Sequence, residues 1–204
     1  ARPACLPLPA TPPNSYDWRS RTRMTEHDNI SSTDDELGVQ VNPALDQHFL
    51  RNPAKLRLLI EAAGIRPTDD VVEVGAGIGT VAEHVPACRS LTVIEYDPNL
   101  TTALGSRVPH ARVLHGDALV LLPTLPCDVL LSNLPGYLTE PLVGLLASLP
   151  FRTAVLAVPR VDDLAPLHGR YRVRLLTVLA LQDFRPAQGS TSELVQLSRT
   201  ELCR

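Results

Sequence analysis

The chain has 204 residues, of which 44% are hydrophobic and 20% are charged, and its formal net charge is −3. A chain of this length buries roughly 70% of its unfolded surface, so one domain needs no disulfide or metal to hold it together. The composition excludes collagen, coiled coil and wholesale disorder. No apolar run reaches the ~20 residues of a membrane-spanning helix, and the acidic balance does not indicate a nucleic-acid-binding face.

Cysteine and histidine spacing gives no metal motif. The cysteines at 5, 88, 127 and 203 form no CxxC pair, and the six histidines form no HExxH pattern. Cys88 and Cys127 lie in apolar segments, which is typical of small buried side chains in a reducing compartment. We therefore expect no bound metal and a cytoplasmic location.

Residues 1–37 differ from the rest of the chain. They begin with a proline-rich stretch that has no helical or strand period, which predicts a disordered segment or an extension. Met24 is the only methionine, so residues 1–23 are candidates for an upstream addition. From Met24 onward, fifteen Lys and Arg face twenty-one Asp and Glu, a net charge of −6. Residues 38–204 are expected to form the folded domain.

Short apolar runs alternate with helix-like segments from about residue 43. The expected helical segments are 43–63 (with a break at Pro53 and a stop at Gly64), 78–85, 98–106 and 139–148. The expected strands are 71–74, 91–95, 112–115, 128–132, 154–158, 174–184 and 193–199.

This alternation predicts an α/β fold with a doubly wound, seven-stranded, mostly parallel sheet of the Rossmann-like type. The last two strands, 174–184 and 193–199, are joined by the turn-like sequence PAQGSTS. They predict a hairpin, so the C-terminal strand should be antiparallel and form a reversed edge of the sheet.

Polar or glycine-rich sequences follow three successive predicted strands. Residues 73–79 read EVGAGIG, Glu95 comes twenty residues after Gly75, and Asp117 follows the third strand. In a doubly wound sheet these strand ends meet at the ligand-binding edge, and an acid at the spacing of Glu95 can accept both ribose hydroxyls. The pattern predicts a nucleoside-bearing cofactor. NAD is disfavoured because the first loop lacks GxGxxG.

The combination QHFL, EVGAGIGT, IEYD, GDAL and NLP, spread over residues 47–135, resembles the ribosomal RNA adenine dimethylase family. The likeness extends over roughly residues 38–200. It implies a class I methyltransferase fold and S-adenosyl-L-methionine as cofactor. The cofactor-binding residues expected on this basis are Gln47, His48, Leu50, Glu73, Gly75, Gly77, Glu95, Tyr96, Asp117, Ala118, Asn133 and Pro135.

One position departs from the family pattern. The fourth family motif is Asn-Leu/Ile-Pro followed by Tyr or Phe, whose ring stacks on the target adenine, whereas this chain has Gly136 there and Tyr137 one position later. Base–aromatic stacking is worth about 1–3 kcal/mol. We therefore expect a vacancy at Gly136 that admits a bulkier ring; a shifted but equivalent loop is the alternative.

The candidate catalytic residues are Asn133, Tyr137, Glu140 and His48. Asn133 has an amide oxygen that could accept from an N–H substrate, and Tyr137, Glu140 and His48 are the nearest ionisable groups. Glu140 has an alternative role as a first-turn acid that favours the dipole of helix 139–148.

Three functions remain open. The first is methylation of an indole-type nitrogen heterocycle of a small molecule in specialised metabolism. Gly136 and the net negative charge of the chain from Met24 onward favour it. The second is N6-methylation of an rRNA adenine, in antibiotic resistance or ribosome maturation, with RNA as the partner. The third is a binding module without activity, which the intact motifs disfavour. A homodimer is expected if the sheet edge and helical faces are otherwise uncovered, and no membrane partner is expected.

Overall fold

The computed structural model describes residues 32–34 and 38–200. The predicted N-terminal segment therefore lies largely outside the described residues. Its residues Ser32–Asp34 form a short strand, β1, antiparallel to β2 (Val39–Val41).

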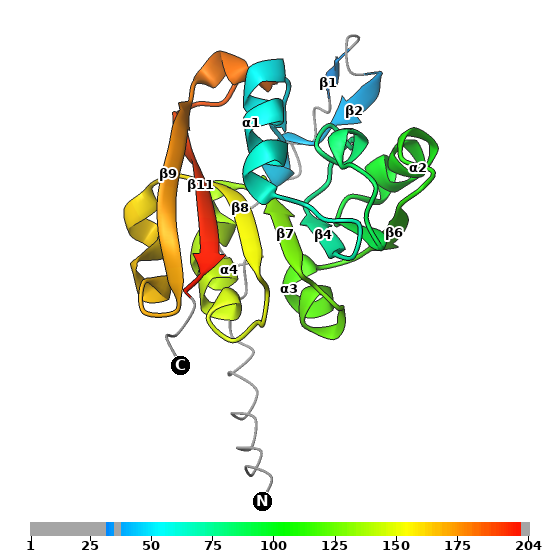
Figure 1. Cartoon of the computed structure of the whole chain (residues 1–204). Coiled ribbons are helices and arrows are strands. Elements are labelled where there is room, and N and C mark those ends of the chain that lie inside the picture. Colours follow the sequence, from blue (N-terminus) through cyan, green and yellow to red (C-terminus); the bar gives the residue numbers. More distant parts are fainter. Residues whose placement is uncertain (1–31, 35–37, 201–204) are drawn as a thin grey trace, which may run out of the picture.

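A seven-stranded sheet organises the domain, in the order β6-β5-β4-β7-β8-β11-β9 (Figure 1). Its strands are β4 (Asp70–Val74), β5 (Ser90–Glu95), β6 (Arg112–His115), β7 (Val129–Ser132), β8 (Thr153–Val158), β9 (Tyr171–Leu179) and β11 (Ser192–Arg199). Strands β4 to β8 are parallel, so their carboxyl ends meet at one edge of the sheet. The predicted fold class is confirmed.

The antiparallel strand β11 lies between β8 and β9 and pairs with both. The C-terminal strand is thus reversed as predicted, but its expected place at the sheet edge is wrong. Leu194, Val195 and Leu197 of β11 are fully buried, which requires cover on both faces and suits an interior strand. Strand β9 instead takes the edge, where Arg172 and Arg174 are exposed to solvent.

The α-helices are α1 (Pro53–Ala63), α2 (Pro98–Arg107), α3 (Ala118–Leu121) and α4 (Thr139–Leu146). The break predicted at Pro53 and the stop at Gly64 are confirmed: Asn52 caps the start of α1, and Gly64 is left-handed. The part of the chain described here contains no helix with the length and apolar character needed to cross a membrane.

Short elements connect the helices and strands. The 3-10 turns are η2 (Pro43–Leu45), η3 (Ala82–His84), η4 (Leu122–Thr124), η5 (Gly136–Leu138), η6 (Val161–Leu167) and η7 (Leu181–Asp183), and the short strands β3 (Phe49–Leu50) and β10 (Phe184–Arg185) pair with each other.

Three predicted elements differ from the structure. The part of the expected helical segment 43–63 that precedes Pro53 is instead the 3-10 turn η2 and the strand β3, because Asp46 is left-handed and Phe49 and Leu50 pair with β10. The helix expected at 78–85 is reduced to η3, because Gly79 has a φ of 87°, which a right-handed helix cannot contain. The strand expected at 174–184 ends at Leu179, and the chain then turns through η7 so that β10 can pair with β3.

Side chains on the two faces of the sheet form separate hydrophobic clusters. Leu56 and Leu59 of α1 pack on one face with Leu131, while Leu142 and Leu146 of α4 pack on the other with Leu130. Neighbouring residues of one strand therefore serve opposite layers, as the two-residue period of a strand requires.

Replacing Leu131 by Ala should lower the free energy of unfolding by about 2–5 kcal/mol, because Leu131 is 0% exposed at the centre of the sheet. Urea denaturation measures the change. Val120→Ala is the control: this side chain is 66% exposed, and its loss should change stability by less than about 0.5 kcal/mol. Equal effects of the two substitutions would contradict this packing.

Candidate active site

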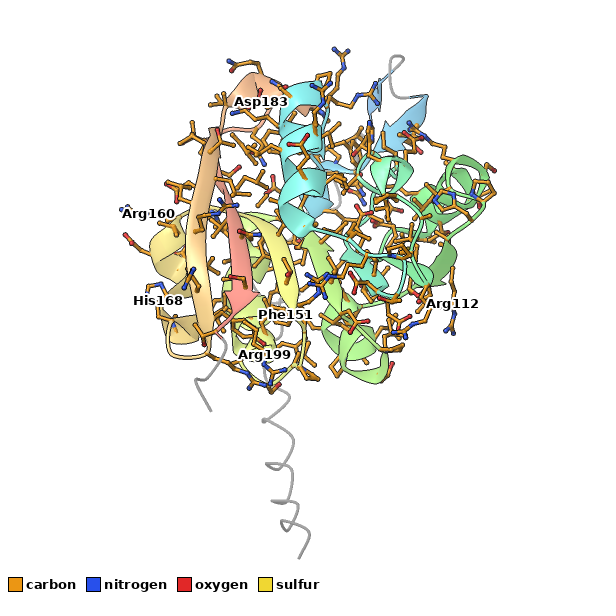
Figure 2. All side chains as sticks on the ribbon, viewed as in Figure 1. Arg112, Phe151, Arg160, His168, Asp183 and Arg199 are labelled. Atoms are coloured by element: carbon orange, nitrogen blue, oxygen red, sulfur yellow. The ribbon has the colours of Figure 1, made fainter. Side chains whose placement is uncertain are left out.

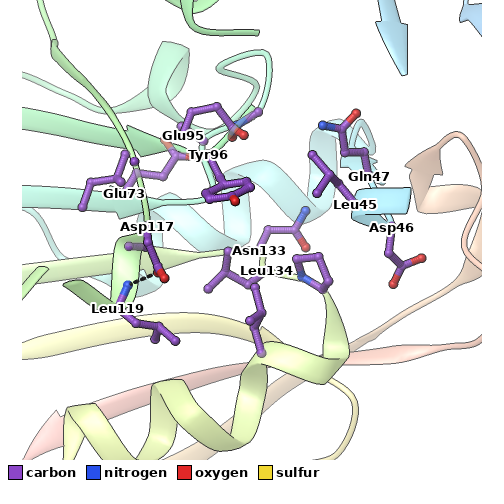
Figure 3. A pocket seen from close by; sticks show the side chains of 18 of the residues that line it. Leu45, Asp46, Gln47, Glu73, Glu95, Tyr96, Asp117, Leu119, Asn133 and Leu134 are labelled. Atoms are coloured by element: carbon purple, nitrogen blue, oxygen red, sulfur yellow. Dashed lines mark hydrogen bonds between the residues drawn. The ribbon is translucent and has the colours of Figure 1, made fainter. Parts of the chain in front are cut away.

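A cavity of about 950 Å³ opens at the carboxyl ends of β4, β5, β6 and β7 (Figure 3). The segment Leu45–Phe49 closes one side of it. The predicted site residues that line it are Gln47, His48, Glu73, Gly75, Gly77, Glu95, Tyr96, Asp117, Ala118, Asn133, Pro135 and Tyr137. The structure thus brings together residues that are up to ninety positions apart in the sequence.

Two predicted site residues do not line this cavity. The Leu50 side chain is fully buried in the core on the α1 face of the sheet. Glu140 lies in the first turn of α4 and borders a second hollow, which is also lined by Gly136 and Tyr137 of η5. Its position fits the role of an acid that favours the helix dipole.

The glycine turn after β4 allows the chain to double back tightly. Gly75 and Gly77 have φ values of 69° and 56°. A Cβ on Gly77 would come within 2.5 Å of the Phe49 ring, so a side chain there would push away the segment that closes the cavity.

Glu95 is held at the centre of the cavity floor. One carboxylate oxygen accepts from the backbone N–H of Gly77 at 2.7 Å and the other from that of Asp97 at 2.8 Å. Each carboxylate oxygen has a second lone pair, so these bonds orient the group and still allow it to accept from ribose hydroxyls. Burial raises the pKa of Glu95 above its ordinary value.

Glu73 is a second buried carboxyl, on the neighbouring strand β4. Its side chain lines the cavity, and its Oε2 has no hydrogen-bond partner among the described residues. Burial, together with the negative charge of Glu95, raises the pKa of Glu73 to about 8. A buried carboxyl with one unpartnered oxygen favours a ligand that brings positive charge into the cavity.

Asn133 and His48, which both line the cavity, are linked by a hydrogen bond. The Asn133 amide nitrogen Nδ2 donates to the backbone carbonyl of His48 at 3.0 Å. Because a carbonyl can only accept, this bond determines which way round the amide lies. The Asn133 oxygen Oδ1 is therefore available to accept from a substrate N–H.

Comparison with known proteins identifies the arrangement. Residues 38–161 match the family model described as ribosomal RNA adenine dimethylase. The chain belongs to this family. The glycine turn, Glu95, Asp117 and Asn133 all lie within the matched region.

Curated relatives carry related names. A ribosomal RNA small subunit methyltransferase A from Thermobifida fusca is 36% identical over 149 residues, covering 66% of this chain and 52% of that protein. A probable dimethyladenosine transferase from Drosophila melanogaster is 34% identical over 185 residues, covering 78% of this chain and 60% of that protein. The chain thus spans just over half the length of these two relatives.

Solved structures share the fold. A dimethyladenosine transferase from Plasmodium falciparum superposes with a TM-score of 0.69 at 24% identity, covering 75% of this chain and 64% of the other. The 23S rRNA methyltransferase ErmE gives a TM-score of 0.66 at 21% identity, covering 74% and 70%.

The expected vacancy at Gly136 is wrong. Gly136 does not line the main cavity, and a Cβ placed on it would approach Pro159 Cγ at 3.0 Å. Gly136 begins the 3-10 turn η5, and Tyr137, the next residue of that turn, lines the cavity. The shifted but equivalent loop is therefore the better interpretation, because an aromatic side chain lines the same cavity as Asn133.

Asp46 is a cavity residue that the sequence analysis did not single out. Its carboxylate Oδ1 lies 3.0 Å from His48 Nε2. The only available signal was its place directly before QHFL, which does not distinguish a functional acid from a solvated loop residue.

The stability of the ligand-free protein should fall as pH rises from 6 to 8. The contribution of the raised Glu73 pKa is complete below the ordinary pKa of a glutamate and is lost as pH rises through about 8. The expected slope is at most about 1.4 kcal/mol per pH unit, measured by urea denaturation. Glu73→Gln should flatten this slope, whereas Glu61→Gln, at an exposed position on α1, should leave it unchanged. A wild-type slope that Glu73→Gln does not alter would refute the assignment.

Proposed function

We propose that this chain transfers a methyl group from S-adenosyl-L-methionine to the exocyclic N6 of an adenine in ribosomal RNA. The observation that carries the proposal is that Asn133 and Tyr137 line the same cavity as the strand-end acids. Family membership and the names of the relatives agree with it.

The residues present fit the cofactor. Glu73 is buried with an unpartnered oxygen in the cavity, which suits a ligand that carries positive charge. Glu95 would accept from the ribose hydroxyls, and Asp117 and Ala118 would border the adenine. When bound, the cofactor supplies an electrophilic methyl group on a sulfonium.

An adenine acceptor fits the part of the cavity that Asn133 and Tyr137 line. Tyr137 would stack on a base that is flipped out of the RNA, as enzymes acting on a nucleobase require. Asn133 Oδ1 and the backbone carbonyls of residues 134 and 135 would accept from the N6 hydrogens. This turns the nitrogen lone pair toward the methyl carbon, and positioning of this kind supplies much of the rate in a displacement reaction.

The indole-type small-molecule acceptor loses its structural basis. That hypothesis required open space at Gly136, and Pro159 lies against that position. The relatives are named dimethyladenosine transferase and ribosomal RNA small subunit methyltransferase A, and these names favour the RNA alternative.

The reaction can be tested by incubating the protein with isotopically labelled cofactor and, in parallel, deproteinised ribosomal RNA or indole. We expect label in the RNA, recovered after nuclease digestion as N6-methylated adenosine. Label in indole with none in RNA would overturn the proposal.

Tyr137→Ala should lower kcat/KM for RNA by about 5- to 150-fold, which corresponds to the 1–3 kcal/mol of base stacking. Tyr137→Phe keeps the ring and should retain activity within a few-fold. Cofactor affinity, measured by calorimetry, should stay the same in both variants. An alanine variant as active as wild type would exclude stacking by this residue.

A further inference from the structure

We infer that Asp46 is a positioning residue: its carboxylate and the Pro186 carbonyl hold the His48 ring at both nitrogens, and the ring in turn holds the segment that orients the Asn133 amide. The inference rests on the proposed function, because the Asn133 amide is taken as the group that receives the substrate N–H.

The backbone of Asp46 is unusual. With a φ of 50°, it is the only non-glycine residue among those described that has a positive φ. Asp tolerates this left-handed conformation better than most residues, and such conformations concentrate at functional sites. Here the conformation ends η2 and turns the chain so that the Asp46 carboxylate meets His48 two residues later.

The His48 ring is engaged at both nitrogens. Nδ1 lies 2.9 Å from the backbone oxygen of Pro186, and Nε2 lies 3.0 Å from Asp46 Oδ1. A backbone carbonyl and a carboxylate can only accept hydrogen bonds. A neutral imidazole has one N–H and can satisfy only one of these partners, whereas the imidazolium satisfies both.

The ring is linked to the reaction site through its own backbone. The His48 carbonyl accepts from Asn133 Nδ2, and the next two residues, Phe49 and Leu50, pair with β10 just before Pro186. His48 therefore connects Pro186, in the C-terminal part of the chain, with the Asn133 amide that faces the substrate. Releasing either ring contact frees the carbonyl on which the amide orientation depends.

Several other charged or titratable groups surround this unit. The pKa of Tyr137 on η5 is raised first by burial and then by electrostatic interaction with Asp46 and Tyr96. Asp97 accepts from the Gln47 amide at 2.8 Å, and Arg185 of β10 pairs in register with Phe49. Because Asn and Gly at position 46 both remove the charge that acts on Tyr137, the difference between these two variants reports on the hydrogen bond to His48.

The decisive substitution is Asp46→Asn. Asn also tolerates the left-handed backbone, and its amide can donate to an unprotonated Nε2 while Nδ1–H still reaches Pro186. Asp46→Gly is the matched control, since it keeps the backbone conformation and removes the side chain. The single-turnover rate of RNA methylation is measured for all three proteins at the same pH and at saturating cofactor.

Asp46→Gly should be slower than wild type by about 2- to 10-fold, the value of one net hydrogen bond. Asp46→Asn keeps a group that can bond the ring and should restore most of this rate. An Asp46→Gly variant as fast as wild type, or an Asp46→Asn variant as slow as Asp46→Gly, would overturn the inference.

A second measurement needs no RNA and separates this inference from the proposed function. In ¹⁵N spectra of histidine-labelled protein at one fixed pH, with His48 assigned from a His48→Gln spectrum, the His48 ring signals should differ between wild type and Asp46→Gly, because the ring loses one hydrogen-bond partner. Identical ring signals would refute the inference even if RNA is methylated. Different signals without RNA methylation would uphold the contact and reject the acceptor.

Discussion

The site depends on the left-handed glycine turn that follows the first strand of the parallel sheet. This turn brings the Gly77 N–H to the Glu95 carboxylate on the neighbouring strand, and it leaves room for the Phe49 ring directly above. One local conformation thus fixes the floor of the cavity and the segment that closes it. A side chain at Gly77 would disturb both, because there is no space for a Cβ.

Charge and burial in the cavity are matched to a cationic ligand. Two glutamates end neighbouring strands, and each is almost entirely removed from solvent. Glu95 is compensated by backbone N–H groups, whereas one oxygen of Glu73 has no partner among the described residues. Such a group costs stability in the free protein and is relieved when a positive charge enters. The same unpartnered oxygen therefore lowers the stability of the free protein and favours the binding of a cationic ligand.

The segment before α1 links distant parts of the chain. Asn52 caps α1, and its side-chain amide also donates to the Asp183 carboxylate in η7, the turn before β10. The start of α1 is therefore attached to the part of the domain where Figure 2 labels Asp183. Together with the β3–β10 pairing, this bond connects the C-terminal part of the sheet to the residues that close the cavity. The last strands thereby support the site, although the cavity lies at the ends of β4 to β7.

The sequence by itself determined the α/β class, the alternation of strands and helices, and twelve of the thirty residues that line the cavity. These follow from local rules: apolar periodicity, glycine after a strand, and acids at strand ends, which parallel pairing must bring to one edge. It did not determine the interior position of β11, the role of Asp46 or the placement of Tyr137. The position of β11 depends on burial from both faces, and the role of Asp46 depends on a His48 ring whose other contact, Pro186, lies 138 residues away along the chain. The placement of Tyr137 depends on a 3-10 turn packed against Pro159. Only the tertiary structure places such groups together.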